Sequence, residues 1–257
     1  MTAHATSRHM PIIFALLVSV LLLAACGSSA APSVTTHKPT ATANTSVKPA
    51  VSYVALGASD AVGVGASDPN TQGYVPIIIS RLPKGSEALN LGVSGILLHD
   101  ALKQELPEVA AAQPTVITIW LVGNDFRGCT SLQQYAADLD TLLTTLHDQT
   151  HAQVFVVNTP EMSLLPYFRE GAPQGGACVQ GASTAQVHAM VLQWNQVIDP
   201  IVAKHGDVLV DLYNTDFASH PEYVSSRDGF HPSNQGYARL ADLFWTQVLA
   251  HKAVPVA

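Results

Sequence analysis

The sequence predicts an α/β protein in which helices cover both faces of a parallel sheet, giving a three-layer α/β/α sandwich with about five strands. Two observations support this prediction. Short apolar runs alternate along the chain with longer segments that have the apolar spacing of helices. The apolar runs are nearly continuous in Val, Ile and Leu, which is typical of parallel strands buried on both faces.

The predicted domain opens with a strand, a helix and a second strand. Residues 51–56 form an apolar run that stops at Gly57. Residues 73–82 have helical apolar spacing and are followed by Pro and Gly, which commonly end helices. Residues 87–91 form a short second strand that runs into the Gly-rich stretch 92–95.

A second helix, a central strand and a long third helix follow. Residues 98–112 have helical spacing, although Pro107 disturbs the hydrogen bonding of a regular helix. Residues 115–122 are apolar and rich in β-branched side chains, which favours a central strand. The amphipathic helix at 132–149 precedes another buried strand at 153–157.

The last expected elements are a helix at 185–204, a strand at 208–212 and a helix at 235–249. Ser233 or Asn234 is expected to cap this final helix, because both residue types accept hydrogen bonds from the first turn. In a parallel α/β sheet, ligands bind beyond the carboxyl ends of the strands. The functional residues are therefore expected in the segments that follow the strands.

The first 25 residues predict export. Arg8 precedes the apolar run 11–25, which is shorter than the roughly 20 residues that a bilayer crossing needs, so 1–25 is interpreted as a signal peptide. The run ends in Leu-Ala-Ala-Cys, which resembles the bacterial lipobox and implies lipidation of Cys26. The alternative is an ordinary cleaved signal in which this cysteine is incidental.

Residues 26–50 are mostly Ala, Ser, Thr, Pro and Val and include no aromatic residue. Such a segment buries too little apolar area to fold, so it is expected to be a flexible tether ahead of a single domain at 51–252. Two or more acyl chains on Cys26 would hold that domain at a membrane surface. We therefore expect an exported protein anchored to the bacterial cell membrane, with its domain outside the cytoplasm.

The composition argues against one class of partner. The chain of 257 residues has 12 Lys and Arg against 19 Asp and Glu, and the basic residues form no cluster. Nucleic-acid binding is not expected, because it needs a basic surface. Neither His-Glu-x-x-His nor Cys-x-x-Cys occurs, so the sequence suggests no metal site and no cofactor.

Two distant segments together suggest nucleophilic catalysis. In Asp228-Gly229-Phe230-His231-Pro232, an acid precedes a histidine by three positions, which suits a loop that pairs carboxylate and imidazole. Ser59 follows the first strand, and a serine becomes a strong nucleophile when a base removes its proton. We predict Ser59 as nucleophile, His231 as base, and Asp228 as the group that fixes the imidazole tautomer.

An ester attacked by Ser59 would form a tetrahedral oxyanion, which needs preorganised hydrogen-bond donors. Three donors are predicted: the backbone N–H of Ser59, the backbone N–H of Gly95 and the side-chain amide of Asn124. A glycine at 95 allows close approach of the backbone. Alone, each of these residues is also a common turn or strand-end residue, so the prediction depends on all of them together.

The four segments, in this order, resemble the SGNH (GDSL-type) hydrolase family. The matching segments are Gly57-Ala58-Ser59-Asp60, Asn90 to Gly95, Gly123-Asn124-Asp125 and Asp228 to Pro232. The resemblance implies a catalytic set of Ser59, Asp228 and His231, with Gly95 and Asn124 as oxyanion donors. Two positions depart from the family pattern: Ala58 replaces aspartate, and Val122 stands where glycine often occurs.

With this resemblance, the expected fold is flavodoxin-like and the expected function is a serine esterase or lipase that forms an acyl-Ser59 intermediate. The substrate would be a small-molecule, lipid or glycan ester. Two alternatives stay open. One is a carbohydrate O-deacetylase acting on cell-wall or environmental glycans, and the other is a non-catalytic surface lipoprotein that binds glycans.

Cys129 and Cys178 remain after lipidation of Cys26, and an isolated pair in an exported protein favours a disulfide. Two separate buried thiols are the alternative.

The irregular segment 160–182 is long enough for a lid. Together with one residue from the segment after Asn124, this segment would form an apolar wall for the substrate. The alternative is that 160–182 is a packed excursion that covers core. The wall residues would be Phe126, Leu165, Tyr167 and Phe168.

Overall fold

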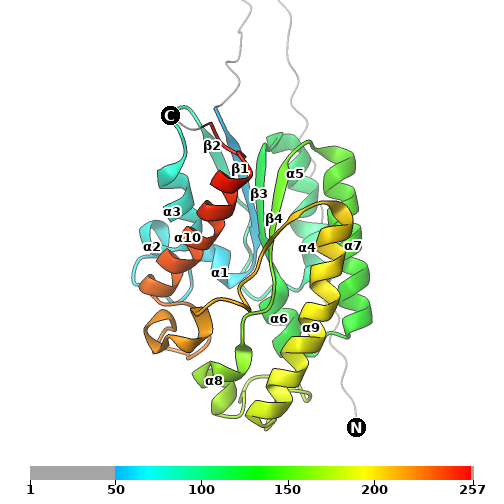
Figure 1. Ribbon diagram of the computed structural model, residues 1–257, viewed down its shortest axis with the longest axis vertical. Coiled ribbons are helices and arrows are strands. Elements are labelled where there is room, and N and C mark those ends of the chain that lie inside the picture. The colour runs from blue at the N-terminus through cyan, green and yellow to red at the C-terminus, as the bar shows by residue number, and fades with distance from the viewer. Residues whose placement is uncertain (1–49, 256–257) are drawn as a thin grey trace, which may run out of the picture. The chain divides into compact units, whose positions relative to one another are not determined.

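The computed structural model describes residues 50–255, which contain one five-stranded parallel sheet with helices on both faces (Figure 1). The strand order is β2-β1-β3-β4-β5, and every neighbouring pair is parallel. This order confirms the expected three-layer, flavodoxin-like arrangement. The strands are β1 Ser52–Gly57, β2 Glu87–Asn90, β3 Val116–Trp120, β4 Gln153–Val157 and β5 Val208–Val210.

The topology creates the place where a site can form. After β2 the chain crosses to the other side of β1, so β1 and β3 become neighbours and their following loops diverge. Such a reversal in a parallel sheet opens a crevice beyond the carboxyl ends of the two strands. Both strands are buried along their whole length, which explains their continuous apolar sequences.

One helical layer contains α3 and α10, and the other contains α4, α5, α7 and α9 (Figure 1). The other four helices of the described residues lie in the connections. The bounds are α1 Ser59–Val62, α2 Pro69–Gln72, α3 Tyr74–Arg81, α4 Leu98–Gln104, α5 Leu106–Ala112, α6 Val122–Gly128, α7 Leu132–Gln149, α8 Pro166–Arg169, α9 Thr184–His205 and α10 Asn234–Ala250. Three short 3-10 turns lie at Met162–Leu164, Phe217–Ser219 and Pro221–Tyr223.

Aromatic contacts hold the layers together. Tyr74 of α3 stacks on Phe244 of α10 with ring centroids 5.3 Å apart. On the other face, Trp194 of α9 contacts Tyr135 of α7 at 4.8 Å and Phe126 of α6 at 5.5 Å. Truncating one such ring to alanine costs about 3–5 kcal/mol in a typical core, so these contacts fix how the helices lie on the sheet.

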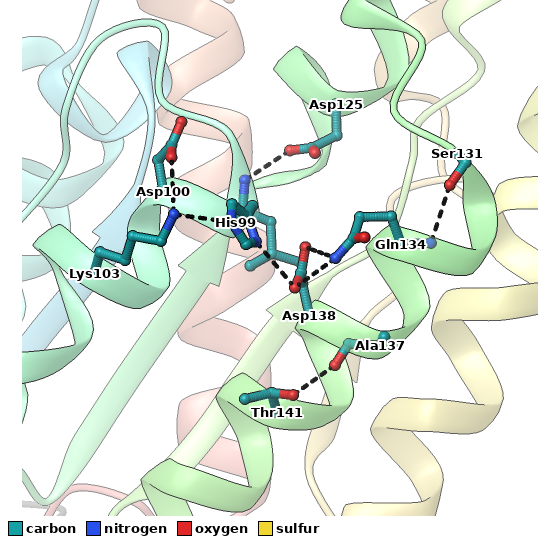
Figure 2. Close-up of polar contacts among 10 residues, drawn as sticks. His99, Asp100, Lys103, Asp125, Ser131, Gln134, Ala137, Asp138 and Thr141 are labelled. Carbon is teal, nitrogen blue, oxygen red and sulfur yellow. Dashed lines mark hydrogen bonds and ion pairs between the residues drawn. The ribbon is translucent and has the colours of Figure 1, made fainter.

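Serine side chains begin the three longest helices. Ser131 accepts a hydrogen bond from Gln134 N at the start of α7, 3.2 Å away (Figure 2). Ser183 forms a capping box at α9, and Ser233 caps α10 by accepting from Gly236 N. Each cap satisfies a backbone N–H that has no partner within its helix. Of the two caps proposed for the last helix, Ser233 is therefore the one observed.

The structure corrects two predicted elements. The helix expected at 98–112 is two helices, α4 and α5, which break at Glu105 because this side chain turns into the interior and Pro107 lies in the first turn of the second helix. The strand expected at 115–122 ends at Trp120, and α6 begins at Val122. The helix α6 was not predicted.

The segment 160–182 is packed against the domain. Cys129 and Cys178 form a disulfide, which confirms the predicted pairing. Buried side chains along the segment include Met162, Leu165, Phe168 and Val179. Tyr167 N donates to Gly229 O over 3.0 Å, which ties the segment to the loop of the predicted acid and base. Of the two interpretations of this segment, the packed excursion fits the structure.

The predicted signal peptide at 1–25, the lipidation site Cys26 and nearly all of the tether at 26–50 lie outside the described residues. Within 50–255, no helix combines the length and apolar character needed to cross a membrane.

Candidate active site

The structure brings Ser59, His231 and Asp228 together in one hydrogen-bonded chain. Ser59 Oγ lies 2.8 Å from His231 Nε2, and His231 Nδ1 lies 2.6 Å from Asp228 Oδ2. An ionised carboxylate only accepts hydrogen bonds, so Nδ1 carries the proton and Nε2 is left to accept from the serine hydroxyl. This is the geometry in which an imidazole acts as general base toward a serine.

Ser59 owes its position to the end of β1. The strand stops at Gly57, and α1 begins at Ser59 itself, which turns the serine away from the sheet. A Cβ at Gly57 would lie 2.7 Å from the Cβ of Ala61, so only glycine allows this tight turn. Ser59 is 6% exposed, which keeps its hydroxyl near the imidazole and largely shielded from bulk water.

The loop that carries the acid and the base is shaped by the acid itself. Asp228 Oδ1 accepts from Phe230 N at 2.9 Å and from His231 N at 3.0 Å, while Oδ2 faces the ring. Gly229 has a φ of +65°, and a Cβ there would come within 2.9 Å of Pro166. The spacing of three residues therefore lets one carboxylate hold both the loop backbone and the imidazole.

Asp228 is electrostatically suited to its place. Burial alone would raise the pKa of Asp228, but the hydrogen bonds from the Phe230 backbone and from the His231 ring and backbone outweigh it and hold the pKa below its ordinary value. The carboxylate is therefore ionised near neutral pH. It keeps the proton on Nδ1 of His231 and favours an imidazolium when one forms.

The predicted oxyanion donors border the same groove as Ser59. Gly95 has a φ of +84°, a conformation that glycine adopts without strain, and it follows β2 in the turn after Val93. Asn124 Nδ2 donates one hydrogen to Ile96 O over 3.0 Å. A carboxamide has two N–H donors, so the second N–H of Asn124 is available to an oxyanion.

The helix α6 holds Asn124 in place. Asn124 lies in its first turn, and the next residue, Asp125, accepts from Leu98 N over 2.8 Å. Figure 2 shows this carboxylate turned toward the start of α4. The contact joins α6 to the first residue of α4. Burial raises the pKa of Asp125 to about 6, partly offset by hydrogen bonds including that from Leu98.

A groove of about 310 Å³ runs along Ser59. Four of its lining residues belong to the predicted site, and the other four, which include Phe230 and Arg127, were not among the predicted site residues. Phe230 lies next to the base and supplies an apolar surface to the groove. The full lining is Ser59, Val64, Ser94, Gly95, Asn124, Arg127, Phe230 and His231.

A second cavity, of about 20 Å³, lies beside His231 and is also lined by Asp60, Trp120 and Leu165. This volume suffices for one water molecule. The buried Nε1 of Trp120 has no hydrogen-bond partner among the described residues.

Burial raises the pKa of Asp60 to about 6, with His231 opposing the shift. Within 50–255 the side chain of Asp60 makes no hydrogen bond to another residue's backbone.

Glu105 is a further residue that the sequence analysis missed. It is 1% exposed, and its Oε2 accepts from Gly57 N over 3.1 Å, directly beneath the nucleophile turn. Burial raises the pKa of Glu105 to about 8, and backbone hydrogen bonds only partly oppose this. A signal was present, because Glu105 follows Leu98 and Ala101 on the apolar face of the predicted helix.

The predicted substrate wall is wrong for three of its four residues. Phe126 is 0% exposed and packs edge-on against Phe168 at a centroid distance of 5.6 Å. Tyr167 and Phe168 are also buried, and their rings pack against the ring of Phe230. Of the four, only Leu165 lines one of the two cavities that contact His231, the smaller one. These aromatic rings support the groove, and Phe230 is the one that faces it.

The residues at 50–255 include no group of three or more His, Cys, Asp or Glu placed to hold a metal ion.

The fold and the site together define a class. A parallel 2-1-3-4-5 sheet carries a serine after β1, an amide donor after β3, and an Asp-x-x-His loop ahead of the last helix. This arrangement characterises the three-layer hydrolases of the SGNH type. Residues 55–239 match the GDSL-like Lipase/Acylhydrolase family, and the chain belongs to this family.

Solved structures share this fold. An extracellular lipase from Streptomyces rimosus is 22% identical, covers 76% of this chain and 98% of its own, and has a TM-score of 0.59. A lipase/acylhydrolase from Enterococcus faecalis is 19% identical, with coverages of 77% and 95% and a TM-score of 0.59. An acetyl xylan esterase, AlAXEase, is 16% identical, with coverages of 76% and 98% and a TM-score of 0.57. A search of curated proteins found no match.

Proposed function

We propose that the protein is a serine esterase that hydrolyses carboxylic esters through an acyl-Ser59 intermediate. The observation that carries the proposal is the hydrogen-bonded chain from Ser59 through His231 to Asp228, with contacts of 2.8 and 2.6 Å. Membership of a family of lipases and acylhydrolases supports it.

The proposed reaction begins when Ser59 Oγ attacks the ester carbonyl and His231 Nε2 takes the serine proton. The carbonyl oxygen becomes an oxyanion, which the N–H groups at Ser59, Gly95 and Asn124 stabilise. The C–O bond then breaks, and His231 gives its proton to the departing alcohol. In the second half, His231 takes a proton from water, the resulting hydroxide attacks the acyl-serine, and the proton returns to Ser59.

The test combines turnover and covalent labelling. The purified protein should hydrolyse p-nitrophenyl esters and react with a fluorophosphonate probe. Ser59→Ala should lower turnover by roughly 10⁴–10⁶ and abolish labelling. Ser80→Ala, an exposed serine on α3, is the matched control and should keep both. Unchanged ester hydrolysis in pure Ser59→Ala protein rejects the mechanism, and a wild type that neither hydrolyses nor labels favours a non-catalytic binding protein.

Carbohydrate O-deacetylation is the second candidate, and the surface around the catalytic loop favours it. Two polar grooves, of about 520 and 370 Å³, share the segment 224–227 beside Asp228. Ser225, Ser226 and Arg227 line both and offer hydrogen-bonding groups of the kind that sugar hydroxyls need. A series from acetyl to palmitoyl esters, together with acetylated xylo-oligosaccharides and cell-wall glycans, separates the candidates, since a deacetylase prefers acetyl and a lipase prefers long chains.

We further propose that the domain acts outside the cytoplasm, held at the bacterial cell membrane by lipid on Cys26. The basis is the export-type sequence at 1–25 and its Leu-Ala-Ala-Cys ending. Cys26→Ala should move the protein from the membrane fraction to the soluble fraction. A wild-type protein whose N-terminal peptide carries no acyl mass would contradict the anchor.

A further inference from the structure

Among the described residues that line the catalytic groove, Arg127 is the one arginine or lysine. It lies near the end of α6, three positions after the oxyanion donor Asn124. Because a helix places residues three apart on the same face, Arg127 and Asn124 both reach the groove. A charge at this position lies beside the place where an ester would react.

Within residues 50–255, Arg127 makes no side-chain hydrogen bond and no ion pair. The ion pairs of the other basic groups are with acids elsewhere, as in Arg81 with Asp242 and Arg239 with Asp216. The described residues that line the groove include no Asp or Glu, although acids outnumber Lys and Arg in the chain by 19 to 12. A guanidinium presents five N–H donors and is always charged, so this one is free to bind an anion.

The position of Arg127 is fixed from both ends. Its carbonyl oxygen accepts from Gly176 N over 2.8 Å, and Cys129, two residues later, is bonded to Cys178. The guanidinium lies 5.6 Å from the ring centroid of Phe230 and 5.9 Å from that of Tyr167. Cation–π contacts with two rings orient the side chain and leave its N–H edge unused. A preorganised donor loses little entropy when it binds a ligand.

We propose that Arg127 is a specificity-determining residue that binds an anionic group of the substrate, a carboxylate or a phosphate, beside the ester that Ser59 attacks. Both groups have the planar or multi-oxygen geometry that a guanidinium binds through two parallel hydrogen bonds. This inference rests on the proposed esterase function and names the substrate class for that same groove: esters that carry a negative charge near the scissile bond.

The test compares matched esters on the wild type. On the alcohol side, phenyl acetate is neutral, 3-acetoxybenzoate adds a carboxylate and 3-acetoxyphenyl phosphate adds a phosphate. On the acyl side, p-nitrophenyl hexanoate is compared with the p-nitrophenyl monoester of adipic acid. On at least one side, the anionic ester should have the higher kcat/KM, mainly through a lower KM. On the alcohol side, whichever anionic ester gains more in kcat/KM over phenyl acetate shows whether the site prefers a carboxylate or a phosphate.

Arg127→Gln should lower the ratio of kcat/KM for the anionic ester to that for its neutral partner by about 10- to 100-fold, and Arg127→Lys should restore part of it. Raising the ionic strength from about 0.01 M to about 0.15 M should reduce the wild-type ratio. Arg169→Gln is the matched control, because it removes the same charge from an exposed residue of α8 outside the groove. It should leave the ratio unchanged.

Three outcomes would overturn the inference. The first is that no anionic ester, on either side, has a higher kcat/KM than its neutral partner. The second is that the anionic-to-neutral ratio of kcat/KM is unchanged in Arg127→Gln. An equal fall for neutral and anionic esters assigns Arg127 to the fold or to the oxyanion instead. Each leaves the esterase proposal standing, because neutral esters are still cleaved by the wild type. A wild type that cleaves no ester of the set overturns both proposals.

Discussion

Ser59 Oγ and His231 Nε2 lie 2.8 Å apart, although 172 positions separate the two residues in the chain. Ser59 follows β1, which lies between β2 and β3 in the sheet, and His231 belongs to the loop ahead of α10, the last helix. The carboxyl ends of parallel strands meet at one edge, so the two loops converge there. This contact places the serine hydroxyl within direct proton-transfer distance of the imidazole.

Asp228→Asn should lower kcat by about 10⁴. Asparagine keeps the oxygen that accepts from Phe230 N and His231 N, so the loop should retain its shape. Its amide presents N–H to the ring where Oδ2 presented an acceptor, which favours the tautomer that cannot take the serine proton. Steady-state kinetics with a p-nitrophenyl ester measures the loss. A fall of less than tenfold, with unchanged thermal stability, would show that the carboxylate is dispensable.

Asn124→Ala should lower kcat by about 10²–10³ and leave KM nearly unchanged, because an oxyanion donor acts mainly in the transition state. The amide also holds Ile96 O, so the melting temperature of the variant must be compared with that of the wild type. Glu108→Gln, an exposed change on α5, controls for the preparation. A rise in KM at constant kcat would assign Asn124 to ground-state binding instead.

Glu105→Gln should make stability less dependent on pH. The pKa of Glu105 is about 8 in the folded protein against an ordinary value of 4.5. Between these pH values the folded state keeps a proton that the unfolded state has lost, so wild-type stability falls as pH rises, by at most about 1.4 kcal/mol per pH unit from this group. This contribution is complete below pH 4.5 and is lost as pH passes 8.

Urea unfolding at intervals from pH 5 to pH 8 measures this effect. The free energy of unfolding should fall more steeply with pH in the wild type than in Glu105→Gln, which keeps an oxygen for Gly57 N. Glu108→Gln should retain the wild-type slope, because Glu108 is exposed. Equal slopes in all three proteins would show that Glu105 does not keep its proton in the fold. Asp60 and Asp125, whose pKa values are also raised, contribute equally to each protein.

Replacing Cys129 and Cys178 together by serine should lower the free energy of unfolding by up to about 4 kcal/mol, the chain-entropy value for a closed loop of this length. The disulfide joins residues 49 positions apart. Urea unfolding measures the change, and the reduced wild type should match the double variant. Two free thiols in the denatured, unreduced wild type would contradict the bond.

Much of the fold could be predicted because buried positions make apolar residues recur at regular intervals in the sequence. The helix at 132–149 and the strand at 153–157 agree with α7 and β4 at both ends. The helix at 98–112 was predicted as one element because its spacing is continuous, whereas the structure breaks it where Glu105 leaves the helix to bind Gly57 N. That partner lies 48 positions away, and no local pattern reveals it.

The predicted site residues gather at one edge, but the prediction of the substrate surface failed. Phe126 was assigned to the groove because it closely follows Asn124, yet on α6 the two side chains point in different directions. Residues two apart on a helix do not share a face, whereas residues three apart do. Arg127, which does reach the groove, was overlooked because the helix itself was not predicted.

By itself, the sequence determined the alternation of strands and helices, the four segments that carry the reactive groups, and the cysteines able to pair. These follow from periodicity and residue chemistry, which act over a few positions. Only the tertiary structure decided which aromatic rings face the groove, that Glu105 is buried beside the turn of Ser59, and that Arg127 has no acid partner within residues 50–255. Those properties depend on segments that are far apart in the chain and meet only when the sheet and its helices pack.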